Sequence, residues 1–174
     1  MVLVGHMRRE KDPLTALRAL ARLPDPMLRL HHAGRTDDPQ IGPLAQALAQ
    51  QDPRIVLHGA LAHQASRELI AGSQLMLLPS VMEGGANVLI ESVMSNVPVL
   101  ASRISGSIGM LGDDYPGYFP VGDDLALAQL IERCTTQPAF VERLRTHGAQ
   151  RAALFEPARE AANVRALANK LVAA

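Results

Sequence analysis

The chain has little of several things that particular protein classes need. Its 174 residues include one cysteine, Cys134, so no disulfide can form within the chain, and a reducing compartment, the cytoplasm, is the simplest expectation. Cys134 falls among leucines at helical spacing, which favours a buried thiol over a nucleophile. Aromatic residues make up 3% of the sequence, and 17 basic residues balance 17 acidic ones. A nucleic-acid-binding protein is therefore disfavoured, because it needs a basic surface or aromatic stacking platforms.

Long apolar runs and several familiar motifs are also missing. No stretch approaches the ~20 residues of a membrane span, and the first residues lack the pattern of a signal peptide. Neither G-x-G-x-x-G nor G-x-x-x-x-G-K-[ST] follows the first apolar run, which disfavours a nicotinamide enzyme and a P-loop nucleotidase. No D-x-D occurs, which disfavours metal-dependent sugar transfer. His31 and His32 would point to opposite faces of a strand, so we expect no metal site there.

Short apolar runs alternate with segments of helical period, which predicts an α/β fold. The runs that we expect to be strands are 2–4, 28–31, 54–57, 74–78 and 98–101. The expected helices cover 12–23, a segment introduced at 38–39, and 64–71, 87–95, 123–135, 138–155 and 157–172. Such alternation implies right-handed βαβ units and a doubly wound, Rossmann-like parallel sheet. Ligands of such sheets bind outside the carboxyl ends of the strands.

Two aspartate–proline pairs predict where the first two helices begin. Asp12 is placed to cap the first helix and Pro13 to be its first residue. Asp38 and Pro39 are expected to introduce the second helix in the same way. After the last expected strand the chain continues into an alanine- and arginine-rich helical tail.

The stretch after the fourth expected strand carries the strongest chemical signal. Its pattern predicts a glycine loop, a helix and a further strand. Gly84, Gly85 and Ala86 have almost no side chain, so a ligand can approach backbone amides where the helix begins and its dipole is positive. Glu83 and Glu91 bracket this helix start with seven residues between them. Two carboxylates beside an anion-binding helix end suit a ligand that has both sugar hydroxyls and phosphates, such as a nucleotide sugar.

Each of the three charged residues near this loop also has a simpler interpretation. Lys11, between the first strand and the first helix, is placed to neutralise a diphosphate, but it also fits an exposed lysine in a turn. Glu83 is favoured by the helix dipole alone, which contributes ~0.3 to 1 kcal/mol. Glu91 stands among apolar residues, where an unpaired carboxylate is costly to bury, and a hydroxyl-bearing ligand is one way to satisfy it. The three residues converge on one edge of a parallel sheet.

A family resemblance joins these signals. Residues 79–101, PSVMEGGANVLIESVMSNVPVLA, resemble the E-x7-E signature of the GT-B glycosyltransferases of the retaining group 1, family 4 type. Residues 4–13, VGHMRREKDP, resemble the motif G-R-L-x-x-E-K-G with which the family's donor domain opens, and HHAG at 31–34 and IVLHG at 55–59 are similar to its next two strands. The resemblance covers residues 1 to about 135. It implies the second, donor-binding domain of such an enzyme, without metal or cofactor, and an amino-terminal acceptor-binding domain that is missing here.

The resemblance also implies a role for individual residues. It assigns Lys11 to the donor diphosphate, Glu83 to hydroxyls of the transferred sugar and Glu91 to the ribose hydroxyls, with Lys11 and Glu83 as the candidate catalytic residues. The other donor-binding positions that it implies are Gly5, His6, His58, Gly84, Gly85, Ala86, Asn87 and Val88. The amides of 84–88 would cradle the distal phosphate and the sugar, and His58 would lie near the base.

Two positions depart from the family pattern, and two segments resemble one particular branch of the family. The family usually has arginine where this chain has His6, so the second cationic contact would be weaker and titratable, with Arg8 or Arg9 as a substitute. Gly85 stands where many relatives carry a larger residue, which leaves room near the sugar. Residues 82–88 and 105–123 are similar to selenosugar synthases of selenoneine biosynthesis, in which a selenium-containing acceptor receives a sugar from a UDP-sugar. A turn-rich connection explains 112–122 equally well.

The sequence therefore favours the donor-binding half of a metal-independent glycosyltransferase that uses a UDP-sugar with retention. We expect residues 1–137 to bind the nucleotide sugar, and residues 138–174 to form a helical tail that packs on this domain or on the missing one. The isolated chain is expected to bind donor weakly and to transfer nothing. A non-catalytic nucleotide- or sugar-phosphate-binding module of the same fold is the alternative, and an NAD-linked sugar epimerase is a third possibility.

Overall fold

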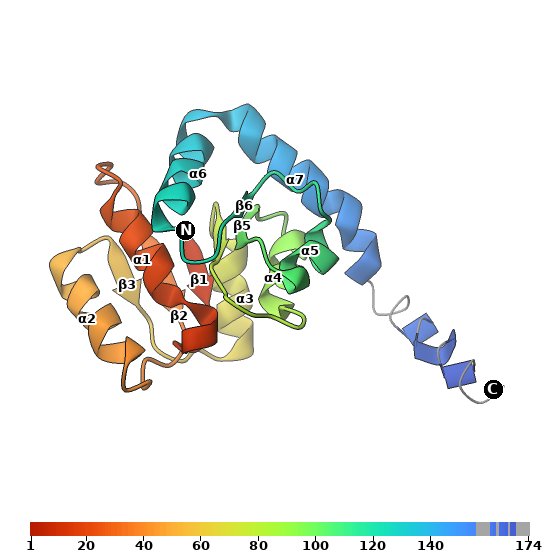
Figure 1. Cartoon of the computed structure of the whole chain (residues 1–174), viewed down its shortest axis with the longest axis horizontal. Helices are drawn as coiled ribbons and strands as arrows, with labels where there is room; N and C mark the ends of the chain where they lie inside the picture. The colour runs from red at the N-terminus through yellow and green to blue at the C-terminus, as the bar shows by residue number, and fades with distance from the viewer. Residues whose placement is uncertain (156–160, 163, 167, 170–174) are drawn as a thin grey trace.

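A parallel sheet forms the centre of the molecule. The computed structural model describes residues 1–155, 161–162, 164–166 and 168–169, and the structural statements below concern these residues. The sheet has six strands in the order β3-β2-β1-β4-β5-β6 (Figure 1). The strands are β1 (Val2–Val4), β2 (Leu30–Ala33), β3 (Ile55–Leu57), β4 (Met76–Leu78), β5 (Val99–Ser102) and β6 (Tyr118–Phe119). All neighbouring pairs are parallel, so the predicted doubly wound α/β fold is confirmed.

Helices cover both faces of the sheet. They are α1 (Pro13–Ala21), α2 (Ile41–Gln51), α3 (His63–Ala71), α4 (Asn87–Met94), α5 (Ser105–Leu111), α6 (Asp124–Thr136) and α7 (Pro138–Ala152), with short 3-10 turns η1 (Arg9–Lys11) and η2 (Ala153–Phe155). α1 packs against α2 and α6, whereas α4 packs against α3 and α7. In Figure 1, α7 leaves α6 and runs past α5. None of the helices in the described part of the chain combines the length and apolarity that crossing a membrane requires.

The central strands have no exposed face. Met76, Leu77 and Leu100 are fully buried, because the helices cover the sheet on both sides. A ligand can therefore reach these strands only at their ends. The chain order reverses between β1 and β4, which lie side by side although α1, α2 and α3 separate them in sequence. This reversal is the topological switch point of a doubly wound sheet, and its carboxyl side is where ligands bind in such folds.

The structure corrects two details of the predicted helix starts. Asp12 is the N-cap of α1 and Pro13 its first residue, as predicted, but the Asp12 carboxylate accepts a bond from the Thr15 hydroxyl (2.6 Å) rather than from a helix amide. The prediction for the second helix is wrong. α2 begins at Ile41, because the Asp38 carboxylate accepts bonds from two later amides and holds the segment before the helix as a turn.

Two elements were not predicted. α5 contains Gly106 and Gly109, which have low helix propensity, and packing of its buried residues Ser107 and Leu111 holds it instead. β6 has two residues and is too short for a periodic pattern. The second strand was predicted at 28–31 and lies at Leu30–Ala33. The predicted helix over 157–172 falls largely outside the described residues.

Candidate functional site

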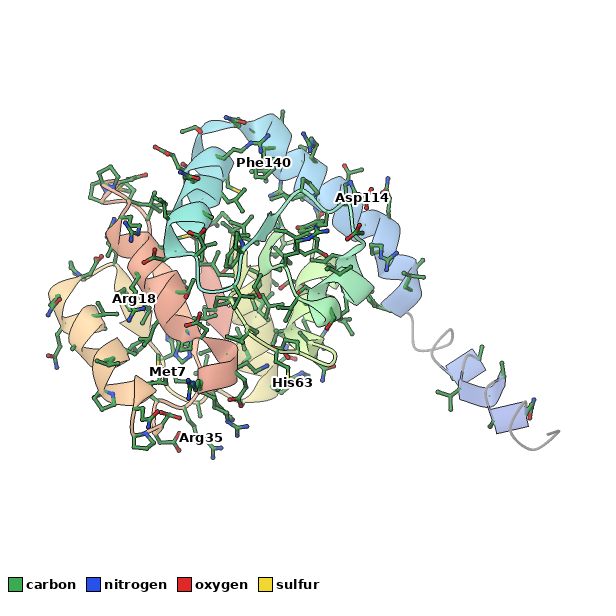
Figure 2. The ribbon with its side chains drawn as sticks, viewed as in Figure 1. Met7, Arg18, Arg35, His63, Asp114 and Phe140 are labelled. Atoms are coloured by element: carbon green, nitrogen blue, oxygen red, sulfur yellow. The ribbon has the colours of Figure 1, made fainter. Side chains whose placement is uncertain are left out.

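The loops that follow β1, β2 and β3 are joined into one surface at the carboxyl edge of the sheet. The Gly5 amide donates to Ala33 O (2.9 Å), and the Gly34 amide donates to Gly59 O (2.8 Å). A Cβ on Gly34 would lie 2.0 Å from Gly5 O, so only glycine permits this approach. In Figure 2, Met7 and Arg35 lie along this edge together with His63, and Phe140 lies at the opposite edge. The surface is therefore set by backbone contacts before any ligand arrives.

Lys11 and Glu83 meet at the switch point. The Lys11 ammonium forms an ion pair with Oε1 of Glu83, 72 residues away in sequence. The Ser80 hydroxyl donates to the same oxygen (2.8 Å). The Glu83 side chain is 8% exposed and that of Lys11 is 34% exposed. The carboxylate is thus buried and satisfied by two donors, while the cation keeps contact with solvent.

Backbone contacts fix the position of this ion pair. The Val81 amide donates to Glu10 O (2.8 Å), which joins the loop after β4 to the turn that carries Lys11. The Ser102 hydroxyl at the end of β5 donates to Ser80 O. A Cβ on Gly106 would lie 2.1 Å from Glu83 O, so the glycine face of α5 lies directly against the Glu83 backbone.

The glycine loop before α4 is open to ligands. A Cβ added to Gly84 or Gly85 would meet nothing within 4 Å. Ala86 is the N-cap of α4 in an extended conformation, and no side chain caps this helix. The Ala86 amide lies 3.4 Å from the sulfur of Met110 in α5. The amides of the first helical turn, Asn87 and Val88 among them, have no intrahelical acceptor and carry the positive end of the helix dipole.

The helix α5, which contacts the glycine loop through Met110, is itself held by α7. The Arg151 guanidinium donates to Met110 O (2.8 Å) and Gly109 O (2.9 Å) at the carboxyl end of α5. Its charge lies at the negative end of that helix, where the dipole favours a cation. Arg151 therefore ties the end of α7 to the helix that lies against the glycine loop.

Glu91 is held by a histidine that the sequence did not indicate. His63, the first residue of α3, contacts Glu91 Oε1 through Nε2 at 2.8 Å. The Glu91 side chain is 18% exposed and that of His63 is 76% exposed. The Glu91 carboxylate therefore has a hydrogen-bond partner within the protein, and its binding to a ligand stays a prediction.

Besides His63, four histidines lie in β2 or in the loops that follow β1 and β3. His6 accepts a bond at Nδ1 from the Arg35 amide (3.1 Å), so its proton is on Nε2 when the ring is neutral. The rings of His58 and His31 stack, with Nε2 and Nδ1 2.9 Å apart. His32 is fully buried with Nε2 2.8 Å from Gly5 O, and burial lowers its pKa. Within the described residues His58 makes no hydrogen bond or ion pair with Lys11 or Glu83, and β2 and β1 lie between them in the sheet.

The predicted residues therefore fall into two groups. Lys11 and Glu83 are in direct contact, and a small pocket beside them is lined by Gly5, His6 and Lys11 with Ser80. His58 lies further along the carboxyl edge. Sequence reasoning missed Ser80 and the carboxylate partner on α3, since their roles depend on contacts between distant segments. A serine two residues after a buried strand is the one local signal that could have indicated Ser80.

A large cavity in the described part of the chain has no predicted site residue in its lining. It measures about 820 Å³ and is lined by Met1, Leu75, Cys134 and Val141 among others. Met1 and Leu75 precede β1 and β4, so this cavity lies at the amino edge of the sheet, opposite the loops described above. Burial raises the pKa of the Cys134 thiol to about 11, which leaves it protonated at neutral pH. Among the described residues no three His, Cys, Asp or Glu side chains are grouped to hold a metal ion.

The fold and the site define a class. A doubly wound sheet with a lysine, a buried glutamate and an open glycine loop at its switch point is a Rossmann-like domain suited to an anionic ligand with hydroxyl groups. The sequence model described as Glycosyl transferases group 1 matches residues 1–137. The chain therefore belongs to the group 1 glycosyl transferase family. No curated protein sequence matches it.

Solved structures agree with this fold. Sucrose-phosphate synthase from Thermosynechococcus elongatus is 27% identical, with a TM-score of 0.83 over 99% of this chain and 45% of that one. HepE from Anabaena, solved in complex with UDP and glucose, is 17% identical, with a TM-score of 0.77 over 99% and 48%. A glycosyltransferase from Rickettsia africae is 18% identical, with a TM-score of 0.74 over 87% and 42%. The chain thus spans less than half the length of each of these structures.

Proposed function

We propose that the chain is the donor-binding half of a glycosyltransferase that transfers a sugar, with retention, from a nucleotide diphosphate sugar to an acceptor. One observation carries the proposal: Lys11 and the buried Glu83 pair at the switch point of a group 1 glycosyl transferase domain. The similar fold of HepE, which has been solved with UDP and glucose and with UDP-glucose, supports a UDP-sugar as the donor.

Lys11 would stabilise the leaving diphosphate. An ammonium group has three donors, and the bond to Glu83 uses one of them. Two donors remain for phosphate oxygens, and the partial exposure of Lys11 lets a ligand reach them. Negative charge on the leaving oxygen grows in the transition state, so a fixed cation lowers the barrier more than it strengthens ground-state binding.

Glu83 would hold the transferred sugar. Both donors that it accepts from, Lys11 and Ser80, lie on Oε1, which leaves Oε2 for a sugar hydroxyl. Because two protein groups already fix the carboxylate, little further ordering is needed when the sugar binds. Glu83 and Lys11 are therefore the proposed catalytic pair, and they would act through charge and position rather than through a covalent bond to the sugar.

The remaining donor contacts follow the same geometry. The open loop at Gly84 and Gly85, with Ala86 and the amides of Asn87 and Val88, would cradle the distal phosphate and the sugar. On the nucleoside side of the donor, Glu91 would bind ribose hydroxyls and His58 would lie near the base. In the loop after β1, Gly5 and His6 would approach the diphosphate.

Several finer points belong to the same proposal. Residues 1–137 would be the donor domain, and residues 138–174 a tail on this domain or on an amino-terminal acceptor domain. The isolated chain would bind donor without transferring it. The resemblance of residues 82–88 and 105–123 to selenosugar synthases supports a selenium-containing acceptor. The single cysteine of the chain supports a cytoplasmic location.

Thermal unfolding with nucleotides tests the site. At a hundredfold excess over Kd, UDP should stabilise the chain by about 2.7 kcal/mol, which raises Tm by roughly 5–10 °C. Lys11→Ala should abolish most of this shift. Arg18→Ala removes an exposed cation on α1 and is the matched control. If UDP, ADP and GDP all leave Tm unchanged, the proposal fails; a shift with NAD alone would favour an epimerase.

A transfer assay separates the enzyme from a binding module. The chain joined to an amino-terminal acceptor domain should release UDP from a UDP-sugar when acceptor is present, and Glu83→Ala should reduce this rate at least tenfold. The isolated chain should bind UDP but should release no UDP from the UDP-sugar. Binding of UDP without transfer in the joined protein would favour the non-catalytic module instead.

A further inference from the structure

The contact between His63 and Glu91 joins two helices across the proposed nucleoside side of the site. Nε2 of His63 lies 2.8 Å from Oε1 of Glu91. His63 (Figure 2) begins α3, directly after the loop that leaves β3. Glu91 lies in the second turn of α4. A largely exposed imidazole therefore fixes a largely buried carboxylate.

Glu91 lies on the same face of α4 as the first residue of that helix. Residues four apart in a helix share a face, so Glu91 lies one turn below Asn87, the first residue of α4. A carboxylate has two oxygens and about four acceptor positions, and His63 uses one position on Oε1. Oε2 and the second position on Oε1 are left for a pair of neighbouring hydroxyl groups.

We propose that His63 is a positioning residue that aims the Glu91 carboxylate at the ribose hydroxyls and so makes the site prefer ribonucleotides to 2′-deoxyribonucleotides. This inference rests on the proposed function, which assigns the ribose to Glu91. A free glutamate side chain has several rotamers, and ordering it on binding reduces affinity. The bond to His63 selects one orientation in advance, and that orientation favours a ligand that offers both hydroxyls.

A purely structural role makes a different prediction. If His63 only joined α3 to α4, its loss would alter stability and affect all nucleotides equally. The His63 side chain is 76% exposed, so water can take its place beside Glu91 and removal of His63 should leave the fold intact. The ratio of the affinities for two ligands that differ in one hydroxyl therefore separates the two roles.

Calorimetric titration with UDP and 2′-deoxy-UDP measures this ratio. The wild-type chain should bind UDP about tenfold more tightly than 2′-deoxy-UDP, since one hydrogen bond to a charged acceptor is lost with the hydroxyl. His63→Ala should weaken UDP binding about three- to tenfold and 2′-deoxy-UDP binding much less, so that the ratio falls. Glu91→Ala should bring the ratio close to one. His63→Gln, which keeps a side-chain N–H donor, should restore most of the preference.

Gln64→Ala is the matched control, because Gln64 is the next residue of α3 and donates to Glu68 in the same helix (2.8 Å). This variant should keep the wild-type ratio. The inference is overturned if His63→Ala lowers the affinities for UDP and 2′-deoxy-UDP by the same factor, changes neither affinity, or gives the same ratio of affinities as Gln64→Ala. If the wild-type chain binds neither UDP nor 2′-deoxy-UDP, the proposed function itself fails and the inference fails with it.

Discussion

The close approach of α5 to the Glu83 loop gives the sharpest test of the site's architecture. A Cβ on Gly106 would lie 2.1 Å from Glu83 O, whereas a Cβ on Gly109, in the same helix, would meet nothing within 4 Å. Neither glycine has a left-handed φ, so alanine suits the backbone at both positions. The two substitutions are therefore chemically identical and differ only in what the new methyl group contacts.

The expected magnitudes follow from this difference. Alanine in place of glycine stabilises a helix interior by roughly 0.5–1 kcal/mol, and Gly109→Ala should show that gain alone. Gly106→Ala carries the same gain but must move the Glu83 backbone by more than about 1 Å, and overpacking of this kind costs about 1–3 kcal/mol. Subtracting one variant from the other cancels the helix contribution. Gly106→Ala should therefore be less stable than Gly109→Ala by about 1–3 kcal/mol.

Urea unfolding measures this difference, with the m-value as a check that both variants unfold alike. Displacement of Glu83 should also weaken UDP binding in Gly106→Ala, while Gly109→Ala should bind UDP as the wild-type chain does. Equal stabilities of the two variants would refute the argument that Gly106 sets the position of Glu83. So would a stable Gly106→Ala variant with wild-type UDP affinity.

Three further predictions concern other parts of the fold. Burial lowers the pKa of His32 below its ordinary value of 6.5. The stability that depends on the neutral ring is therefore fully present above pH 6.5 and is lost as the pH falls through the folded-state pKa, by about 1.4 kcal/mol for each pH unit by which that pKa is lowered. The free energy of unfolding of His32→Gln in urea should fall less at acid pH than that of the wild-type chain, and equal pH dependence of the two proteins would contradict this. The Arg54 side chain is 13% exposed and donates to Leu20 O (2.8 Å) and to Asp52 (2.7 Å). Arg54→Met removes these bonds and should lower the free energy of unfolding in urea by about 2–3 kcal/mol. A loss below about 0.5 kcal/mol would contradict a stabilising role of these bonds. With a pKa of about 11, Cys134 should react with a thiol reagent at pH 8 about a hundredfold more slowly than an ordinary cysteine, and rapid labelling of the native chain would refute this.

The fold was predictable because two signals agreed along most of the chain. Apolar runs of strand length alternate with helical periods, and this pattern alone favours a parallel sheet. The signal failed where local preference and tertiary contacts disagree. α5 contains glycines that disfavour a helix, but Gly106 is needed where the helix approaches the Glu83 backbone. A glycine selected for its small size has the same appearance in the sequence as one that breaks a helix.

The candidate site was predictable in part for a related reason. Glu83 and the glycines after it are neighbours in sequence, so their combination was visible as a motif. Lys11 and Glu83 are 72 residues apart, and sequence reasoning assigned them separate roles without indicating that they pair. His63 and Glu91 are 28 residues apart and meet only because α3 and α4 pack together. Contacts of this kind have no period or spacing from which they can be inferred.

Arg151 connects α7, through α5, to the carboxyl edge of the sheet. Its guanidinium holds the last carbonyl groups of α5, the Met110 sulfur of α5 contacts the Ala86 amide, and Gly106 of the same helix lies against Glu83. α5 is only seven residues long and carries all three of these contacts. The end of α7 and the glycine loop, which do not adjoin in the sequence, are therefore linked through one short helix.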